Sequence, residues 1–269
     1  GGGGVSFVHA DHHCLIFRPG SNELYAGCDG GVYKSSNGGV NNSWVSRNQG
    51  LAITQYYKIG TTDSDPSLTI AGAQDNGTHL NDNGWNKVGG GDGMDCAIDK
   101  LNPNIMYRSI YYGDFDKSTN GGNNFNASFN LPPSGSGNWV TPFIASRISS
   151  NTLYAGFDKL WKSTNGGFSF SATTSNSIFN SNNIDVLAEA PGDPNVIYAG
   201  INNRLYYSSN GGSSWTWISS NIGSGNVITG ITVDPLNSDH VYISKSSYIS
   251  NAKVYESFNA GGSWYNRSS

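Results

Sequence analysis

Apolar and polar residues alternate over short stretches of this chain, and the same order of stretches returns along it. An apolar stretch with a Pro/Asn turn comes first, as in CAIDKLNPN (96–104) and ITVDPLNSD (231–239). A stretch ending in small residues follows, as in TLYAG (152–156) and VIYAG (196–200), and then an aromatic stretch, as in LYYSS (205–209). Short alternating runs bounded by turn residues indicate half-buried β-strands.

A polar turn follows the third stretch, and a Trp or Phe then opens a fourth. The turn reads SSNGG or STNGG, with a looser copy SFNAGG at 257–262 and a shortened one, LNDNGW, at 80–85. Ser and Asn side chains bond nearby backbone, and Gly accepts positive φ, so we expect these turns to be structural. The structural positions are Ser35, Asn37, Ser118, Asn120, Ser163, Asn165, Ser208, Asn210, Ser257 and Asn259.

Repeats of roughly forty residues with four strands each are the signature of β-propeller blades. The pattern therefore predicts an all-β propeller of four-stranded antiparallel blades with about six visible repeats, and a seven-bladed ring is the alternative. We expect a single domain over residues 1–269, with blades at about 9–50, 51–90, 91–135, 136–180, 181–225 and 226–269. The chain opens with GGGGVSFVHA and shows no signal peptide, so we expect a processed form or a piece of a larger protein.

Composition excludes several classes of partner. The formal net charge is −4 and charged residues make up only 13%, so no basic stripe offers a surface to nucleic acid. No apolar run reaches the length of a membrane span, so we expect no membrane insertion. The three cysteines form no disulfide framework or metal-binding pattern, and Cys14, within HCLIF, is expected to pack as a small hydrophobic residue.

The pattern S-x-N-x-G-x-x-W/F resembles the Asp-box, or BNR repeat, with Asn in place of the usual Asp. Three further segments, VHADHH (8–13), QDNGT (74–78) and GGDGMD (90–95), are similar to segments of secreted and surface BNR proteins of Bacteroidetes-type bacteria. A more distant likeness is to sortilin-like propellers and xyloglucan-cleaving propeller hydrolases. The resemblance implies an extracellular or cell-surface protein that can carry further domains in the same polypeptide.

Propellers usually bind ligands on the face built by the connections between blades and by those between the second and third strands. Aromatic, carboxylate and amide side chains gather in these connections, a composition typical of glycan or protein recognition. The alternative is that about half of these aromatics fill gaps between blades. The predicted ligand-binding residues are Tyr56, Tyr57, Gln74, Asn76, Tyr111, Tyr112, Asp114, Trp139 and Asp158. We therefore favour a recognition or adhesion module that binds a glycan or a surface protein.

A glycoside hydrolase is the alternative function, because two carboxylates on one face can act as acid and as base or nucleophile. The candidates are Asp29, Asp75, Asp92 and Asp95, of which Asp29 lies in a turn similar to one that holds a catalytic Asp in xyloglucan-cleaving propellers. These residues can instead cap turns beside Gly. A sialidase is excluded because no Glu is expected near this face. A third hypothesis is a structural spacer inside a large surface protein.

The segment HADHH raises a metal hypothesis, because imidazole and carboxylate groups at close spacing can bind a divalent ion. His9, Asp11 and His13 could converge if the segment starts a strand. The alternative is a hydrogen-bonded cluster that closes the first blade. No other cofactor is expected.

Overall fold

The computed structural model describes residues 8–52, 54–129, 137–174, 179, 182–220, 222, 226–248 and 252–268. These residues form six four-stranded sheets, and each sheet is a meander whose strands pair antiparallel in chain order. The predicted all-β fold of four-stranded antiparallel sheets is confirmed. The one helical turn described, η1 (Tyr111–Gly113), is a 3-10 turn. No helix among the described residues is long and apolar enough to span a membrane.

The first three sheets hold β1 to β12. Their strands are β1 (His12–Phe17), β2 (Leu24–Cys28), β3 (Gly31–Ser35), β4 (Trp44–Ser46), β5 (Lys58–Thr61), β6 (Thr69–Ala73), β7 (Gly77–Asn81), β8 (Trp85–Gly89), β9 (Cys96–Ile98), β10 (Met106–Ile110), β11 (Asp114–Ser118) and β12 (Ala127–Phe129).

The last three sheets hold β13 to β24. Their strands are β13 (Phe143–Ala145), β14 (Leu153–Gly156), β15 (Leu160–Ser163), β16 (Ser171–Ala172), β17 (Val186–Ala190), β18 (Asp193–Ile201), β19 (Arg204–Ser208), β20 (Thr216–Trp217), β21 (Ile228–Asp234), β22 (Asn237–Lys245), β23 (Val254–Ser257) and β24 (Tyr265–Asn266).

The hydrophobic core lies between consecutive sheets. From the second sheet onward, the opening strand of each sheet contacts that of the next: β5 with β9, β9 with β13, β13 with β17, and β17 with β21. Four buried clusters fill these spaces, and each draws on two neighbouring sheets. The aromatic residue after each of the last four turns packs against one cluster: Phe125, Phe170, Trp215 and Trp264. Each sheet therefore buries a face only through its neighbour, as blades do.

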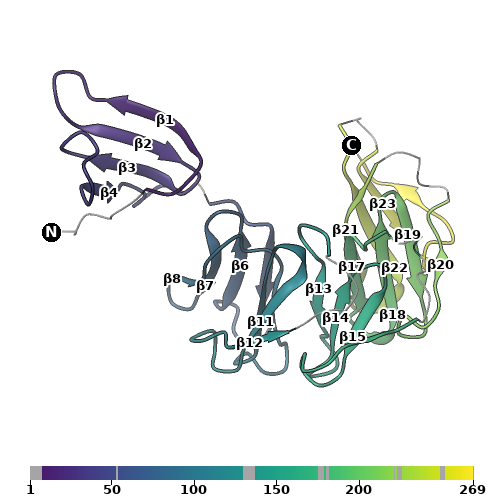
Figure 1. Cartoon of the computed structure of the whole chain (residues 1–269). Helices are drawn as coiled ribbons and strands as arrows, with labels where there is room; N and C mark the ends of the chain where they lie inside the picture. The colour runs from purple at the N-terminus through teal and green to yellow at the C-terminus, as the bar shows by residue number, and fades with distance from the viewer. Residues whose placement is uncertain are drawn as a thin grey trace.

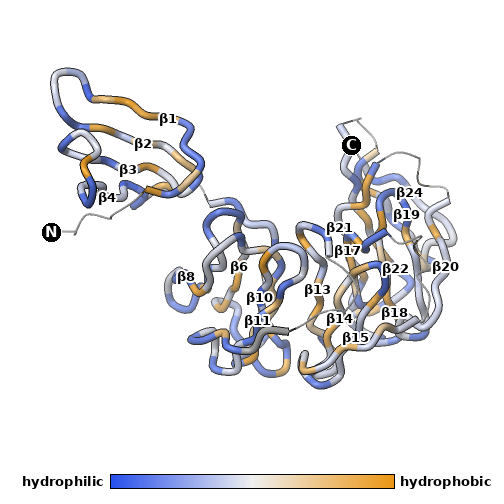
Figure 2. Tube along the Cα trace, in the orientation of Figure 1, coloured by the Kyte–Doolittle hydropathy of each residue, from blue (hydrophilic) through white to orange (hydrophobic). Residues whose placement is uncertain are grey.

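The first sheet is the exception. It stands apart from the arc formed by the other sheets (Figure 1), and none of the buried clusters in the described part of the chain includes its residues. All six residues of β1 are exposed, and Figure 2 shows an apolar stretch along it. Leu15, Ile16 and Phe17 are 62%, 61% and 55% exposed. Cys14 is exposed as well, so the expectation that it packs as a small hydrophobic residue is wrong.

Five of the polar turns, those that begin with Ser, share one internal geometry. In the turn that follows β19, the Ser208 hydroxyl donates to Asn210 Oδ1 at 3.0 Å and accepts from the backbone N–H groups of Gly212 at 2.9 Å and Asn210 at 3.3 Å. The same bonds recur around Ser35, Ser118, Ser163 and Ser257, and all five serines are buried. Each of these serine hydroxyls is therefore bonded within its own turn.

Candidate functional site

The candidate site lies at the end of the sheets opposite the polar turns. In an antiparallel meander, the connection between the second and third strands and the connection to the next sheet emerge at the same end. The turn between β6 and β7 therefore meets the segments that precede β1 and β9. The structure confirms this meeting: Asp75 N donates to Asp92 Oδ1 at 2.8 Å, and the His9 ring Nε2 lies 2.9 Å from Asp75 O.

An open cavity of about 510 Å³ lies where the first two sheets meet, and the first sheet contributes Asp29 to its lining. Two connections of the second sheet line the rest of the cavity, each with three consecutive residues: Gln55, Tyr56 and Tyr57, and Gln74, Asp75 and Asn76.

Hydrogen bonds and ring contacts hold the lining residues in place. Tyr57 OH donates to Gln74 Oε1, and Asn76 Nδ2 donates to Asp29 O at 3.3 Å and to Gln74 O at 3.2 Å. The Tyr56 ring stacks on Trp85 with centroids 5.5 Å apart. The cavity thus combines fixed aromatic rings with carboxylate and amide groups.

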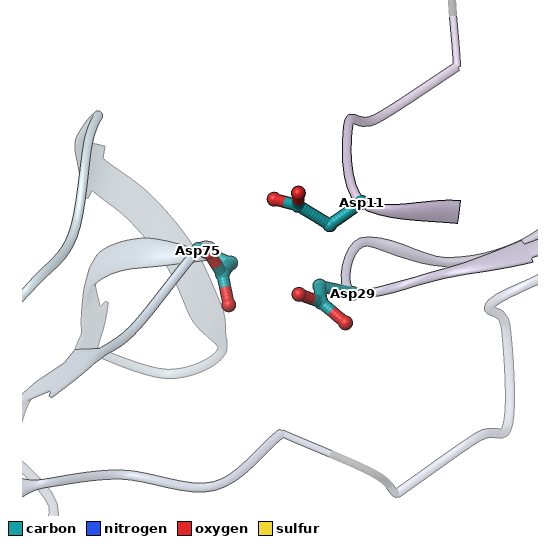
Figure 3. Close-up of side chains that lie close together, drawn as sticks. All are labelled: Asp11, Asp29 and Asp75. Carbon is teal, nitrogen blue, oxygen red and sulfur yellow. The ribbon is translucent and has the colours of Figure 1, made fainter. Parts of the chain in front are cut away.

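Three carboxylates converge here, and two of them, Asp29 and Asp75, line the cavity. Asp11 and Asp29 come from the loops of the first sheet and Asp75 from the second, and their side chains approach one another (Figure 3). One oxygen from each lies within 4.8 Å of the others. Asp75 has a raised pKa, first because of burial and then because of the negative charges of Asp29 and Asp92. Such oxygens are the ligand type that hard cations take, and two of them are also a potential acid–base pair.

The predicted metal set His9, Asp11 and His13 is not the set that converges. His13 Nε2 lies 2.5 Å from Asp29 Oδ1, and His9 faces the Asp75 carbonyl. Of the three, only Asp11 belongs to the carboxylate group. The two histidines bond to residues of the turns around the cavity, which is the arrangement of the alternative, hydrogen-bonded cluster.

An aromatic platform adjoins the cavity, and we define it as Tyr111, Tyr112 and Trp139. The Tyr111 and Trp139 rings are stacked, with centroids 5.5 Å apart and an interplanar angle of 12°. The Tyr112 ring stands at 79° to Trp139. Trp139 Nε1 donates to Tyr57 OH at 3.3 Å, so the platform and the cavity are one continuous surface.

Other predicted residues lie elsewhere. Asp95 is only 8% exposed, and its carboxylate accepts from the backbone N–H groups of Cys96 at 2.8 Å and Phe143 at 3.2 Å. Burial raises the pKa of Asp95 to about 6. Asp114 is exposed at the start of β11, and Asp158 lies in the turn between β14 and β15; neither lines the cavity.

Gln55 also lines the cavity, and the sequence places it on the predicted face, in the same connection as Tyr56 and Tyr57. One feature of the site has no signal in the sequence. Tyr112 has a φ of 61°, in the left-handed region that bulky residues seldom adopt. Nothing in the local sequence marks that conformation, because Tyr has no preference for it.

Comparisons with known proteins agree on the fold. No family model and no curated protein matches the chain. The solved structures include a GH74 enzyme of Niastella koreensis, with a TM-score of 0.63 and 20% identity, covering 99% of this chain and 47% of that one. The GH74 xyloglucanase of Xanthomonas campestris has a TM-score of 0.61 at 15% identity, covering 95% of this chain and 47% of that one. YCF48 of Cyanidioschyzon merolae has a TM-score of 0.57 at 13% identity, covering 96% of this chain and 85% of that one.

These likenesses confirm the β-propeller fold, and at such identities they concern the fold alone. The chain spans about half the length of the GH74 enzymes that it resembles.

Proposed function

We propose that this chain is an extracellular recognition module, a propeller with Asp-box (BNR) turns, that binds a glycan in the cavity between its first two sheets. One observation carries the proposal: the cavity presents tyrosine rings and carboxylate, carboxamide and hydroxyl groups together. Sugar rings bind through exactly these two kinds of contact, because their C–H faces pack on aromatic rings while their hydroxyls bond amides and carboxylates.

The chemistry of the lining favours a glycan over an anionic or purely apolar ligand. The lining residues include no Lys or Arg to attract an anion. Tyr57 is 41% exposed, so its ring is open to a ligand while its hydroxyl is bonded to Gln74. The five Ser–Asn turns stand at the other end of the sheets with their side chains satisfied, which supports a scaffold role for them. The resemblance to secreted BNR proteins supports an extracellular location and a role in adhesion.

A glycan array tests this function. Wild-type protein should bind at least one class of glycan and should release no reducing ends from it. Tyr57→Ala should lower the affinity at least about tenfold, because it removes both the ring and its bonds to the neighbouring side chains. Tyr248→Ala is the matched control, since Tyr248 is fully exposed at 108% and lies outside the cavity. Wild-type protein that binds no glycan would contradict the proposal.

A glycoside hydrolase is the second candidate, and the specific observation in its favour is the approach of Asp29 and Asp75. Their oxygens lie within 4.8 Å of each other, near the separation of about 5 Å that retaining glycosidases use. The raised pKa of Asp75 suits a general acid, while Asp29 would be the nucleophile. Release of reducing ends from a polysaccharide, lost in Asp29→Asn but not in Asp114→Asn, would favour the glycoside hydrolase over the recognition module. If the wild-type protein neither binds a glycan nor releases reducing ends, the results would favour a structural spacer.

A further inference from the structure

The aromatic platform is a cluster of exposed rings. Tyr111 is 39% exposed, Tyr112 is 49% exposed and Trp139 is 37% exposed, although large aromatic rings usually become buried. Tyr111 and Trp139 lie nearly parallel while Tyr112 stands almost perpendicular to both. The three rings therefore pack on one another, and the part of each ring that stays exposed is the surface that a sugar face can contact.

The backbone around the platform is held in a costly conformation. Tyr112 has a φ of 61° and is fixed by two backbone bonds, from Tyr112 N to Trp139 O at 3.4 Å and from Gly137 N to Tyr112 O at 3.0 Å. Gly113 follows with a φ of 82°, and a Cβ there would lie 2.7 Å from the Phe157 ring. Left-handed conformations of bulky residues are unfavourable and persist only where the surrounding structure holds them in place. The platform is thus preorganised before any ligand arrives, which lowers the cost of binding.

A hydrogen-bond path joins the platform to the cavity. Trp139 Nε1 donates to Tyr57 OH, and Tyr57 OH donates to Gln74 Oε1, so the Trp139 ring of the platform and the Tyr57 ring of the cavity share one network. The three side chains of this path are uncharged. A ligand in the cavity can therefore extend over Tyr57 toward Trp139 along neutral groups. The cavity alone has a volume of about 510 Å³ and the platform adjoins it, so the surface has room for a chain of sugars.

We propose that the platform is a second sugar-binding subsite and that the ligand is an extended, uncharged oligosaccharide lying from the platform into the cavity. This inference rests on the proposed glycan-binding function and adds the length and charge of the ligand. Flat sugar faces stack on the rings, and the neighbouring carboxylates of Asp29 and Asp75 repel uronic acids. The platform residues touch the ligand and do not take part in any reaction.

The test is calorimetric titration of the full chain with two-unit and six-unit cello- and xylo-oligosaccharides, and with a six-unit polygalacturonate as the charged comparison. We expect six-unit neutral chains to bind at least about tenfold more tightly than two-unit chains. Trp139→Ala should remove most of this length advantage, about five- to tenfold, while leaving two-unit binding within about twofold. The control is Trp217→Ala, since Trp217 is 53% exposed on β20, away from the platform.

The outcomes separate the two proposals. If the wild type binds none of the sugars here or on the array, the proposed function fails. If it binds them and Trp139→Ala or Tyr111→Ala keeps the full length advantage, only the second subsite is overturned. Equal or tighter binding of polygalacturonate would overturn the proposed charge preference. Circular dichroism of each variant, matched to the wild type, ensures that a loss of binding is not a loss of folding.

Discussion

At the scale of single residues, one buried hydroxyl organises each polar turn. Ser208 is 1% exposed and makes three hydrogen bonds, while the Asn210 Oδ1 also accepts a bond from Ser214 N–H at 2.9 Å. Asn does here what the usual Asp of such turns would do, because either side chain offers an acceptor oxygen to the backbone. The turn chemistry is therefore readable from the residues alone.

Ser208→Ala should lower the free energy of unfolding by about 1–3 kcal/mol, because the backbone N–H groups of Asn210 and Gly212 lose their acceptor in a buried place. Denaturant unfolding measures the loss. Ser213→Ala is the control: Ser213 is exposed in the same turn, and its substitution should change stability by less than about 0.5 kcal/mol. Equal effects of the two substitutions would show that the hydroxyl has no special role.

Asp95 predicts a pH dependence of stability. Its pKa is raised from 3.8 to about 6 in the folded protein, first because of burial, although the charge of Lys58 opposes the shift. The folded state therefore binds more protons than the unfolded state between pH 4 and 6, and its stability falls as pH rises through this range.

We expect the free energy of unfolding of the wild type, relative to Asp95→Asn, to fall by up to about 3 kcal/mol from pH 4 to pH 7. Asn is the matched substitution because it keeps an acceptor oxygen without the titrating group. Denaturant unfolding of both proteins at the two pH values gives this difference. A difference that stays constant with pH would mean that Asp95 is already ionised in the folded protein at pH 4.

At the scale of elements, the polar turns also connect neighbouring sheets. Gly212 has a φ of 88°, and a Cβ there would lie 2.6 Å from Leu160 Cδ2 in β15 of the preceding sheet. The corresponding glycines Gly122 and Gly261 meet Leu80 and Ile218 of their preceding sheets in the same way. These three turns thus close their own hairpins and pack against the sheet before them.

Gly212→Ala should therefore destabilise the protein more than Gly211→Ala. Both glycines have positive φ, of 88° and 67°, but a Cβ at Gly211 meets only Lys162 Nζ, at 4.0 Å. The shared backbone strain cancels in the comparison, and the remaining difference, about 1–3 kcal/mol, reports the contact between sheets. Denaturant unfolding of both variants measures it, and equal losses would show that the contact between turn and sheet contributes nothing.

The strand pattern could be predicted because each repeat carries the same alternation and the same turn residues, so one unit confirms the interpretation of the next. The position of the first sheet could not. Its apolar strand residues, Leu15, Ile16 and Phe17, are typical of a buried strand, yet they lie exposed. Whether a strand meets a neighbour depends on contacts between sheets, and a local pattern carries no information about those contacts.

At the scale of the whole molecule, the candidate site depends on three-dimensional convergence. Asp11, Asp29 and Asp75 are far apart in sequence but meet because two sheets present their connections at one end. The sequence predicted that polar and aromatic residues in equivalent connections share one face, and Tyr56, Tyr57, Gln74 and Asn76 line one cavity there. It could not separate cavity-lining Asp75 from buried Asp95, because the two lie in similar Gly-rich turns and differ only in what covers them.

Hydrogen exchange of the full chain, with and without a bound six-unit neutral oligosaccharide, tests most directly which face binds the ligand. We expect slower exchange in the connections at residues 55–57, 74–76, 111–113 and 137–139, where the cavity and the aromatic platform lie. The turn at residues 208–212 should be unchanged, because its donors are already bonded within the turn. Protection centred on the polar turns, with none in the four connections, would show that the ligand binds at the opposite end of the sheets.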